Sequence, residues 1–370
     1  MRLSAMLRAA TLAGLLVLTA PERPAACAFH SVLPEATISE QIAGSIEVIA
    51  ARPSAADPFR FEVVAVLRGA ASKTSPPHLV DSGMRARLAR DPDDAVLFAH
   101  NVDGSWTRLL VLDATTRPVV EDVLARAAVW ATPGGAAERR DYFAGLLDHP
   151  DDQLRRFALR ELDALPYGVL RSGVYTISDS DLLRGLADIE DMPFAAIRIL
   201  LLGLNGGGAA RDVIAARLAG LASSGANTDL GAWITAAIES GGPAGVARVE
   251  RLFFGQPGGL TQGQLISIVR ALSLHSSEGD PALRIPLNGA LRRLVSLHPN
   301  AVPPCRPGFR CLRNSLADRS VRDALPPARS PTATARITNL SRELPVLDSL
   351  YRASRADTSE GCFVPGAVRR

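Results

Sequence analysis

The stretch that decides the fold is MPFAAIRILLLGL, residues 192–204, in which every position from Ala195 to Leu204 except Arg198 is apolar or glycine. A helix that is apolar on nearly all sides has to be covered on all sides, as happens between neighbouring helices. The stretch is too short to cross a bilayer, which takes about 20 apolar residues. We therefore expect a buried helix inside a larger helical array.

Similar helical segments surround this stretch at regular spacing. They begin at Asp151, Asn227 and Thr261, so that successive starts, counting Met192, are 41, 35 and 34 residues apart. A second helical segment precedes each one, at residues 136–149, 178–189, 210–221 and 246–254. A helix pair that recurs at such a period is typical of a solenoid, because one pair cannot bury its apolar face alone.

The arrangement resembles degenerate HEAT repeats, and the resemblance covers about half of the chain. It implies an all-α HEAT-like solenoid over residues 120–300, with a surface that binds other proteins. A globular helical bundle is the alternative interpretation of the same helices.

Residues 29–115 have a different pattern, which predicts a β-rich domain. In FRFEVVAVL, residues 59–67, apolar and polar residues alternate as in a half-buried strand. The residues expected on the apolar face are Phe59, Phe61, Val63, Ala65 and Leu67.

Four more segments complete this predicted domain. Residues 45–51 are expected to pair with 59–67, and residues 95–101 with 106–113 across a turn at Asp103-Gly104, because glycine accepts a positive φ. A short strand at 78–82 and a helix capped by Ser82 lie between the two hairpins. This element order resembles the OB fold, a five-stranded barrel with one helix. The predicted fold class is thus α+β, with an N-terminal antiparallel OB-like domain followed by helices.

Residues 1–28 are predicted to be a secretory signal peptide. Arg2 and Arg8 precede an apolar run from Ala9 to Ala20, and small residues follow. No later segment reaches the length of a membrane span without a charge or a Gly/Pro break. We expect a periplasmic or secreted protein of a bacterial envelope, with no stable membrane span after processing.

The processing site decides what becomes of Cys27. Cleavage after Ala28 satisfies the small-x-small rule through Ala26 and Ala28 and removes Cys27. Cleavage after Ala26 keeps Cys27 but places Pro24 in the small-residue position. Pro24 also stands where a lipobox needs a residue like leucine, which argues against lipidation. We favour the cut after Ala28.

A surviving Cys27 would matter because of a second resemblance. An OB-like barrel that begins at an exported cysteine is similar to the netrin-like module of tissue inhibitors of metalloproteinases. In that family a free N-terminal cysteine chelates the zinc of the protease, so the resemblance implies this role for Cys27. The family's Cys-x-Cys start is missing here, since Ala28 and Phe29 follow Cys27.

The other cysteines lie in an Arg/Pro/Ser-rich segment, residues 301–370, which we expect to be mostly irregular. The disulfide candidates are Cys305, Cys311 and Cys362, since cysteines pair in oxidising compartments. Cys305 can pair with Cys311, and Cys362 can pair with either of these or with Cys27. A shifted reading frame is an alternative origin for this segment.

Charge argues against nucleic acid as a partner. The chain has a formal net charge of +3, but residues 305–370 hold 12 Arg against 6 acidic residues, so the remainder carries −3. Phosphate contacts need basic residues clustered on the folded surface. We expect another envelope protein as the partner.

Motifs for catalysis, metals or cofactors do not stand out. The glycines at 206–208 lie between two predicted helices and are interpreted as a helix end and a turn. A dinucleotide fingerprint would need a strand before them.

His149 and His298 each precede a proline and are interpreted as capping residues at helix ends. His78 and His100 are expected on strands near Asp81, and we assign them no metal or catalytic role. His30 and His275 complete the histidines, which show no paired ligand spacing.

The sequence thus predicts an exported, non-enzymatic binding or scaffold protein without a cofactor. An exported hydrolase with an unrecognised site and a netrin-like protease inhibitor are the alternatives.

Overall fold

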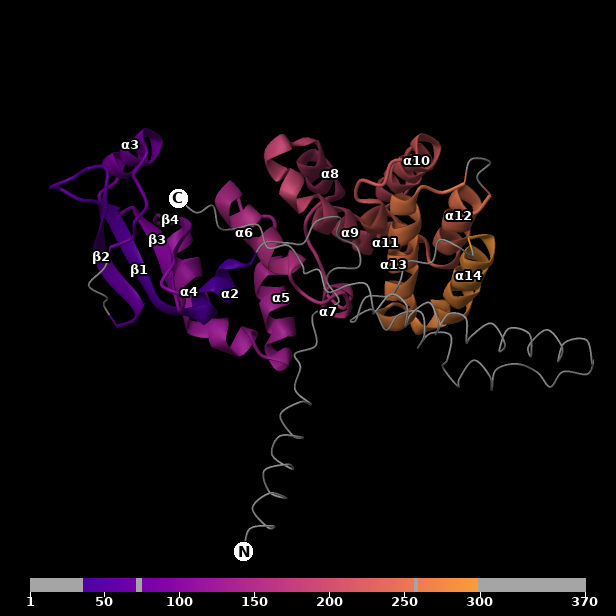
Figure 1. Ribbon diagram of the computed structural model, residues 1–370, viewed down its shortest axis with the longest axis horizontal. Coiled ribbons are helices and arrows are strands. Elements are labelled where there is room, and N and C mark those ends of the chain that lie inside the picture. The colour runs from indigo at the N-terminus through magenta and orange to yellow at the C-terminus, as the bar shows by residue number, and fades with distance from the viewer. Residues whose placement is uncertain (1–35, 71–74, 256–258, 299–370) are drawn as a thin grey trace, which may run out of the picture. The chain divides into compact units, whose positions relative to one another are not determined.

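The computed structural model describes residues 36–70, 75–255 and 259–298. It shows an α+β fold, in which a small antiparallel sheet near the N-terminus is followed by many helices (Figure 1). The predicted fold class is therefore confirmed. Residues 36–271 belong to one compact unit, and residues 272–298 belong to a second. The predicted domain boundaries stay predictions.

The sheet has four strands in the order β2-β1-β3-β4, and every neighbouring pair is antiparallel. Its strands are β1 (Ser45–Pro53), β2 (Phe61–Gly69), β3 (Ala95–Asn101) and β4 (Trp106–Leu112). Both predicted hairpins are present. Gly104 has a φ of +83° in the turn between β3 and β4, as the Asp-Gly pair predicts.

The fifth strand expected at residues 78–82 is reduced to a single bridge between Leu79 and Arg60. Two prolines precede it, and helix α3 (Ser82–Arg90) begins directly after Asp81, so the chain has no room to extend a strand. Strands β2 and β4 remain edges of the sheet. The described residues therefore form a four-stranded sheet instead of the expected five-stranded barrel.

Helix α3 lies where the sequence predicts it, but its cap is one residue earlier than expected. The side chain of Asp81, and not that of Ser82, accepts the backbone N–H of Met84 at 2.7 Å. Asp81 has the extended backbone of an N-cap, whereas Ser82 is already helical.

Strand β2 does not follow the alternation that the sequence predicts. Irregularities in its register against β1 leave Val64 and Leu67 without a paired residue, so the period of two is interrupted twice. Phe61 is buried, while Val64, Ala65 and Val66 are exposed in succession. Phe59, expected on the buried face, is 56% exposed and lies under the guanidinium of Arg85.

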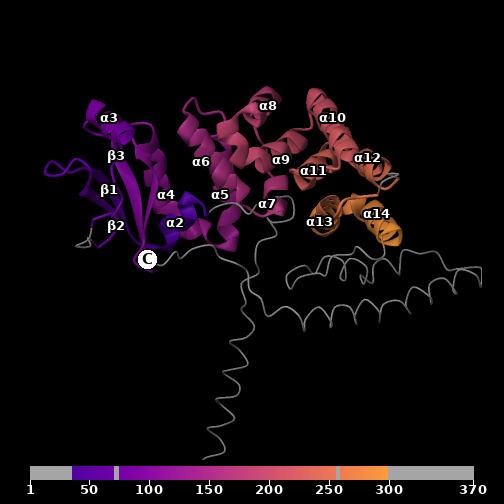
Figure 2. The ribbon, with the colours of Figure 1, turned by 45° about the horizontal axis from the view of Figure 1, so that its top comes forward.

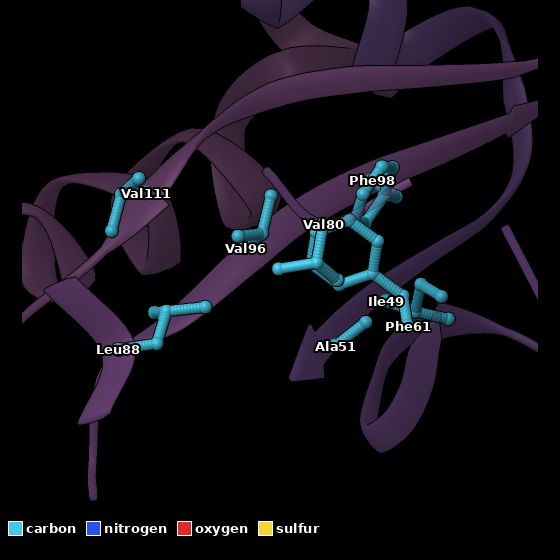
Figure 3. Close-up of a cluster of buried hydrophobic side chains, with 8 residues drawn as sticks. All are labelled: Ile49, Ala51, Phe61, Val80, Leu88, Val96, Phe98 and Val111. Carbon is cyan, nitrogen blue, oxygen red and sulfur yellow. The ribbon is translucent and has the colours of Figure 1, made fainter. Parts of the chain in front are cut away.

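One face of the sheet carries an apolar core that includes α3 and residue Val80 (Figure 3). Phe61 and Phe98 meet edge to face in it, with ring centroids 4.9 Å apart. Its buried members are Ile49, Ala51, Phe61, Val80, Leu88, Val96, Phe98 and Val111.

Two helices pack against the sheet and against each other, namely α2 (Ile38–Gly44) and α4 (Thr116–Trp130) (Figure 2). Helix α2 was not expected. Its start is a capping box, in which Thr37 accepts the N–H of Glu40 and Glu40 accepts the N–H of Thr37. Strand β1 is thus buried along most of its length.

The described residues after α4 are mostly helical, and each segment that the sequence predicts as a helix there contains one. The α-helices are α5 (Ala136–Ala144), α6 (Asp152–Asp163), α7 (Tyr167–Arg171), α8 (Asp179–Ala187), α9 (Ala195–Asn205), α10 (Gly208–Ser224), α11 (Leu230–Gly241), α12 (Pro243–Phe253), α13 (Gln262–Glu278) and α14 (Arg284–Leu297). Short 3-10 turns are η2 (Pro133–Gly135), η3 (Ile189–Phe194) and η4 (Pro281–Leu283).

Helix α9 lies within the apolar stretch of residues 192–204, and it is buried from Ala196 to Gly203. It packs against α6, α8, α10 and α11. A Cβ on Gly203 would overlap Ala236, so glycine lets α9 and α11 approach closely. The expectation of a helix covered on all sides is confirmed.

In the second unit, α14 buries Leu287, Ala290, Leu291 and Leu294 at helical spacing. The hydroxyl of Ser276 donates to Oδ1 of Asn288 at 2.8 Å inside this core. Among the helices of the described residues, none combines the length and the apolar character that crossing a membrane requires.

Candidate functional site

The predicted processing and disulfide residues lie outside the described residues. These are Ala26, Cys27, Ala28, Cys305, Cys311 and Cys362, and the same holds for His30. The candidate site is therefore sought among the polar clusters of the described helices.

A buried ion pair joins the start of α2 to the helical part of the chain. Nε and Nη2 of Arg139 on α5 donate to Oε2 of Glu161 on α6, at 2.9 and 2.6 Å. The other oxygen of Glu161 accepts the N–H of Ser39 at 2.8 Å, and Arg139 also donates to the hydroxyl of Thr37. Both charged side chains are almost fully buried.

Electrostatics in this first cluster are dominated by burial. Removal from water raises the pKa of Glu161, and the guanidinium of Arg139 and the bonds from Ser39 act in the opposite direction. A pair buried in this way needs every partner, because an unpaired buried charge is costly. The cluster is thus a clamp that holds α2 against α5 and α6.

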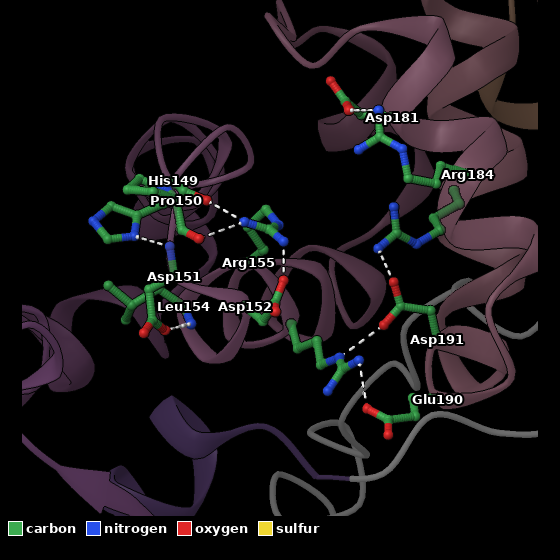
Figure 4. Close-up of polar contacts among 12 residues, drawn as sticks. His149, Pro150, Asp151, Asp152, Leu154, Arg155, Asp181, Arg184, Glu190 and Asp191 are labelled. Atoms are coloured by element: carbon green, nitrogen blue, oxygen red, sulfur yellow. Dashed lines mark hydrogen bonds and ion pairs between the residues drawn. The ribbon is translucent and has the colours of Figure 1, made fainter.

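The second cluster lies where α6 meets the turn before α9 (Figure 4). Oδ1 of Asp191 in η3 accepts a hydrogen bond of 2.7 Å from Nε of Arg156 on α6. Its other oxygen, Oδ2, accepts a hydrogen bond from Nη2 of Arg198 on α9. Arg156 also donates to Glu190 at 2.9 Å. One carboxylate therefore joins two helices that belong to successive pairs.

The two arginines differ in their environments. The bond to Asp191 raises the pKa of Arg156, which is partly exposed. Burial lowers the pKa of Arg198, which lies against Gly185 so closely that a Cβ there would overlap its guanidinium. Arg198 is 5% exposed, so its charge depends on Asp191 for compensation.

The flanks of this cluster cap the start of α6. Asp151 accepts the N–H of Leu154 at 3.0 Å, and Arg155 donates to the carbonyls of His149 and Pro150 (Figure 4). Nδ1 of His149 accepts the N–H of Asp151 at 3.0 Å. His149 is thus a hydrogen-bond acceptor ahead of α6, whereas the sequence suggested a cation at the end of a helix.

The remaining histidines occupy separate environments. His100 stacks on Trp106 with ring centroids 4.3 Å apart, and its Nδ1 lies 3.4 Å from Oε2 of Glu47. His78 lies against Phe98. In the described residues neither histidine bonds to Asp81, which instead caps α3. His275 is buried in α13, and His298 is the C-cap of α14, as expected of a capping residue.

The glycines at 206–208 form the predicted helix end and turn. Gly206 ends α9 in the left-handed conformation with a φ of +66°, and Gly207 precedes α10. A Cβ on Gly207 would overlap the carboxylate of Asp179. An acidic side chain therefore lies beside this glycine turn, where it would repel an anion.

The chemistry of these clusters is that of structural ion pairs. Asp191 and Glu161 are each held by arginines. Nowhere in residues 36–70, 75–255 and 259–298 do three His, Cys, Asp or Glu side chains lie together as metal ligands would.

Beside the second cluster lies an apolar surface that the sequence pattern did not predict. Ile189 and Met192 are 78% and 65% exposed, and Asp188 and Glu190 are exposed beside them. These four residues are called the η3 surface below. The sequence predicts Ile189 as the end of one helical segment and Met192 as the start of the next, and it holds no separate signal for the turn between them.

Comparison of the chain with protein families, curated proteins and solved structures found no match.

Proposed function

We propose that this chain is an exported, non-enzymatic binding or scaffold protein of the bacterial envelope that uses the surface of HEAT-like helical pairs. The observation that carries the proposal is the row of helices α6, α9 and α11, each packed against the next. Each of the three also packs against the helix that begins its pair, namely α5, α8 or α10.

The ion pairs support the repeat interpretation. Arg156 belongs to the second helix of one pair, and Asp191 belongs to the turn within the next pair. A bond of this kind fixes the spacing between successive pairs. Stacked pairs share one core and expose their turns at an edge, where partners of repeat proteins can bind.

The η3 surface is the part of that edge best suited to a partner. Two exposed apolar side chains beside two carboxylates fit a protein surface that combines apolar and basic residues. Isolated exposed apolar residues are common, but Ile189 and Met192 lie within one short turn.

The experiment is capture from envelope extracts with the immobilised chain, followed by mass spectrometry. The proposal expects one protein to be enriched by the wild-type chain and to be lost with Ile189→Ser/Met192→Ser. Val102→Ser changes an equally exposed residue in the turn between β3 and β4 and is expected to retain the partner. Equal capture by all three proteins, or none above beads alone, contradicts the proposal.

A further inference from the structure

The two methionines in the part of the chain that the structure describes differ in their exposure. Met192 in η3 is 65% exposed, whereas Met84 on α3 is half-buried and packs against the apolar core of the sheet. Met1 and Met6, the other methionines of the sequence, lie outside the described residues. An oxidant attacks the thioether sulfur of methionine and has to reach it from water. Of the two described methionines, Met192 is therefore the one that an oxidant reaches more easily.

The exposure of Met192 is imposed by its neighbours. Asp191, directly before it, is buried, and two arginines hold its carboxylate. Phe194, two residues after it, is buried as well. The carbonyl of Met192 accepts the N–H of Ala195. Because the turn is fixed on both sides in this way, the side chain of Met192 is held at the surface.

Met192 shares its apolar surface with Ile189. The two residues are three positions apart in the same 3-10 turn, and side chains at this spacing lie on the same side of such a turn. Ile189 is 78% exposed, and the exposed residues Asp188 and Glu190 flank it. The apolar part of the η3 surface thus consists of two side chains, of which one contains an oxidisable sulfur.

We propose that Met192 is a site of reversible oxidation, and that its oxidation switches off binding at the η3 surface. This inference rests on the proposed function, because the change is felt by the bound partner. Methionine sulfoxide replaces a flexible apolar side chain with a polar one. Oxidation therefore removes one of the two apolar side chains of the η3 surface and leaves Ile189 between carboxylates.

Hydrogen peroxide is the oxidant of the proposed reaction. A lone pair of the Met192 sulfur attacks one peroxide oxygen, so that a sulfur–oxygen bond forms while the oxygen–oxygen bond breaks. The departing hydroxide takes the proton of the transferred hydroxyl and becomes water. The sulfur loses two electrons, which the peroxide gains. A sulfoxide reductase reverses the change with two electrons from two thiols, which become a disulfide, and the oxygen leaves as water.

The fold does not have to change when Met192 is oxidised. Water already surrounds most of this side chain and can solvate the new oxygen. The buried groups that fix η3 belong to its neighbours, Asp191 and Phe194. The same oxidation at Met84 would place a polar oxygen against an apolar core, which costs stability. Met192 is thus suited to a switch, and Met84 is not.

Peptide mapping of the folded full chain after treatment with hydrogen peroxide tests the site. The peptide that contains Met192 is expected to gain one oxygen several-fold faster than the peptide that contains Met84. In urea the two rates are expected to become similar, because unfolding exposes both sulfurs. The two methionine sulfoxide reductases, supplied with dithiothreitol, are expected to remove the oxygen from Met192. Equal rates in the folded chain, or a sulfoxide that the reductases leave in place, overturn the proposal.

Hydrophobic interaction chromatography of the folded chain tests the change of the surface without any partner. Peroxide is expected to make the wild-type chain elute earlier and to leave the elution of Met192→Leu unchanged. The variant keeps every cysteine, so oxidation of thiols affects both chains alike. An equal shift in both chains, or no shift in the wild type, overturns the proposed effect of Met192 on the surface.

Capture from envelope extracts separates this proposal from the proposed function. Peroxide is expected to reduce capture of the partner by the wild-type chain and to leave capture by Met192→Leu at its own untreated level. Undiminished capture by the oxidised wild type overturns the switch, although the proposed function stands. If the untreated wild-type chain captures no protein, the proposed function and the switch fall together, whereas the peptide maps still decide the oxidation site.

Discussion

Asp191 bonds to Arg156 across 35 residues of sequence, and the same carboxylate holds the buried guanidinium of Arg198. Its two oxygens serve two different helices. The stability of the joint between α6 and α9 therefore depends on one acidic residue in a short turn.

Asp191→Ala is expected to lower the free energy of unfolding by about 3–5 kcal/mol, because Arg198 stays buried without its partner. Glu190→Gln is the control. Its side chain is 69% exposed, so a loss below about 1 kcal/mol is expected. Urea unfolding followed by circular dichroism measures both. Equal losses in the two variants would show that Asp191 has no special role.

The clamp between Arg139 and Glu161 predicts a local effect on α2. In Glu161→Gln the carboxylate that accepts the Ser39 N–H becomes an amide, which weakens this bond and the pair with Arg139. The amides of α2 are then expected to exchange with deuterium faster than in the wild type, while those of α11 do not change. Unchanged exchange in α2 would mean that packing alone holds this helix.

Asp113 predicts a dependence of stability on acid pH. Burial acts to raise its pKa, but bonds from Thr116 and Thr115 and the charge of Arg87 outweigh this and lower the pKa from 3.8. A carboxyl with a lowered pKa stabilises the fold above the unfolded value, and this contribution is lost as the pH falls through the folded value. Asp113→Asn should therefore show a smaller loss of stability between pH 5 and pH 3 than the wild type, by thermal unfolding. Equal slopes would contradict the assignment.

The contact between α9 and α11 predicts opposite effects of two glycine substitutions. Gly203→Ala places a methyl group against Ala236 and is expected to cost about 1–3 kcal/mol. Gly220→Ala, in α10 with open space around its Cβ, is expected to stabilise by roughly 0.5–1 kcal/mol. Thermal unfolding of both variants provides the comparison, and a shift of the same sign in both would contradict the close approach.

The helices could be predicted from the sequence because their signals are local. In α9 the unbroken apolar run indicates burial on all sides, and Gly206 marks the end of the helix. The hairpin of β3 and β4 was predictable for the same reason, since Asp103-Gly104 fixes its turn by its backbone preference.

The features of the fold and of the ion-pair clusters that the sequence did not predict mostly depend on contacts between residues far apart in the sequence. The bulges at Val64 and Leu67 arise from the pairing of β2 with β1, so no property of the strand alone indicated that its alternation would break. Helix α2 did have a local signal, the Thr37 and Glu40 capping box, which the β pattern of its neighbours obscured. Arg156 lies 35 residues from Asp191, and Arg139 lies 22 residues from Glu161, so neither of these pairs follows from a local pattern.

The burial of α9 on all sides also has a consequence for synthesis. The face of α9 that packs on α11 stays in contact with water until residues 230–241 have been made. A fragment that ends at Asn205 would carry that apolar face uncovered, so it is expected to aggregate. Nascent chains of this protein thus need protection from one another over the interval in which α10 and α11 emerge.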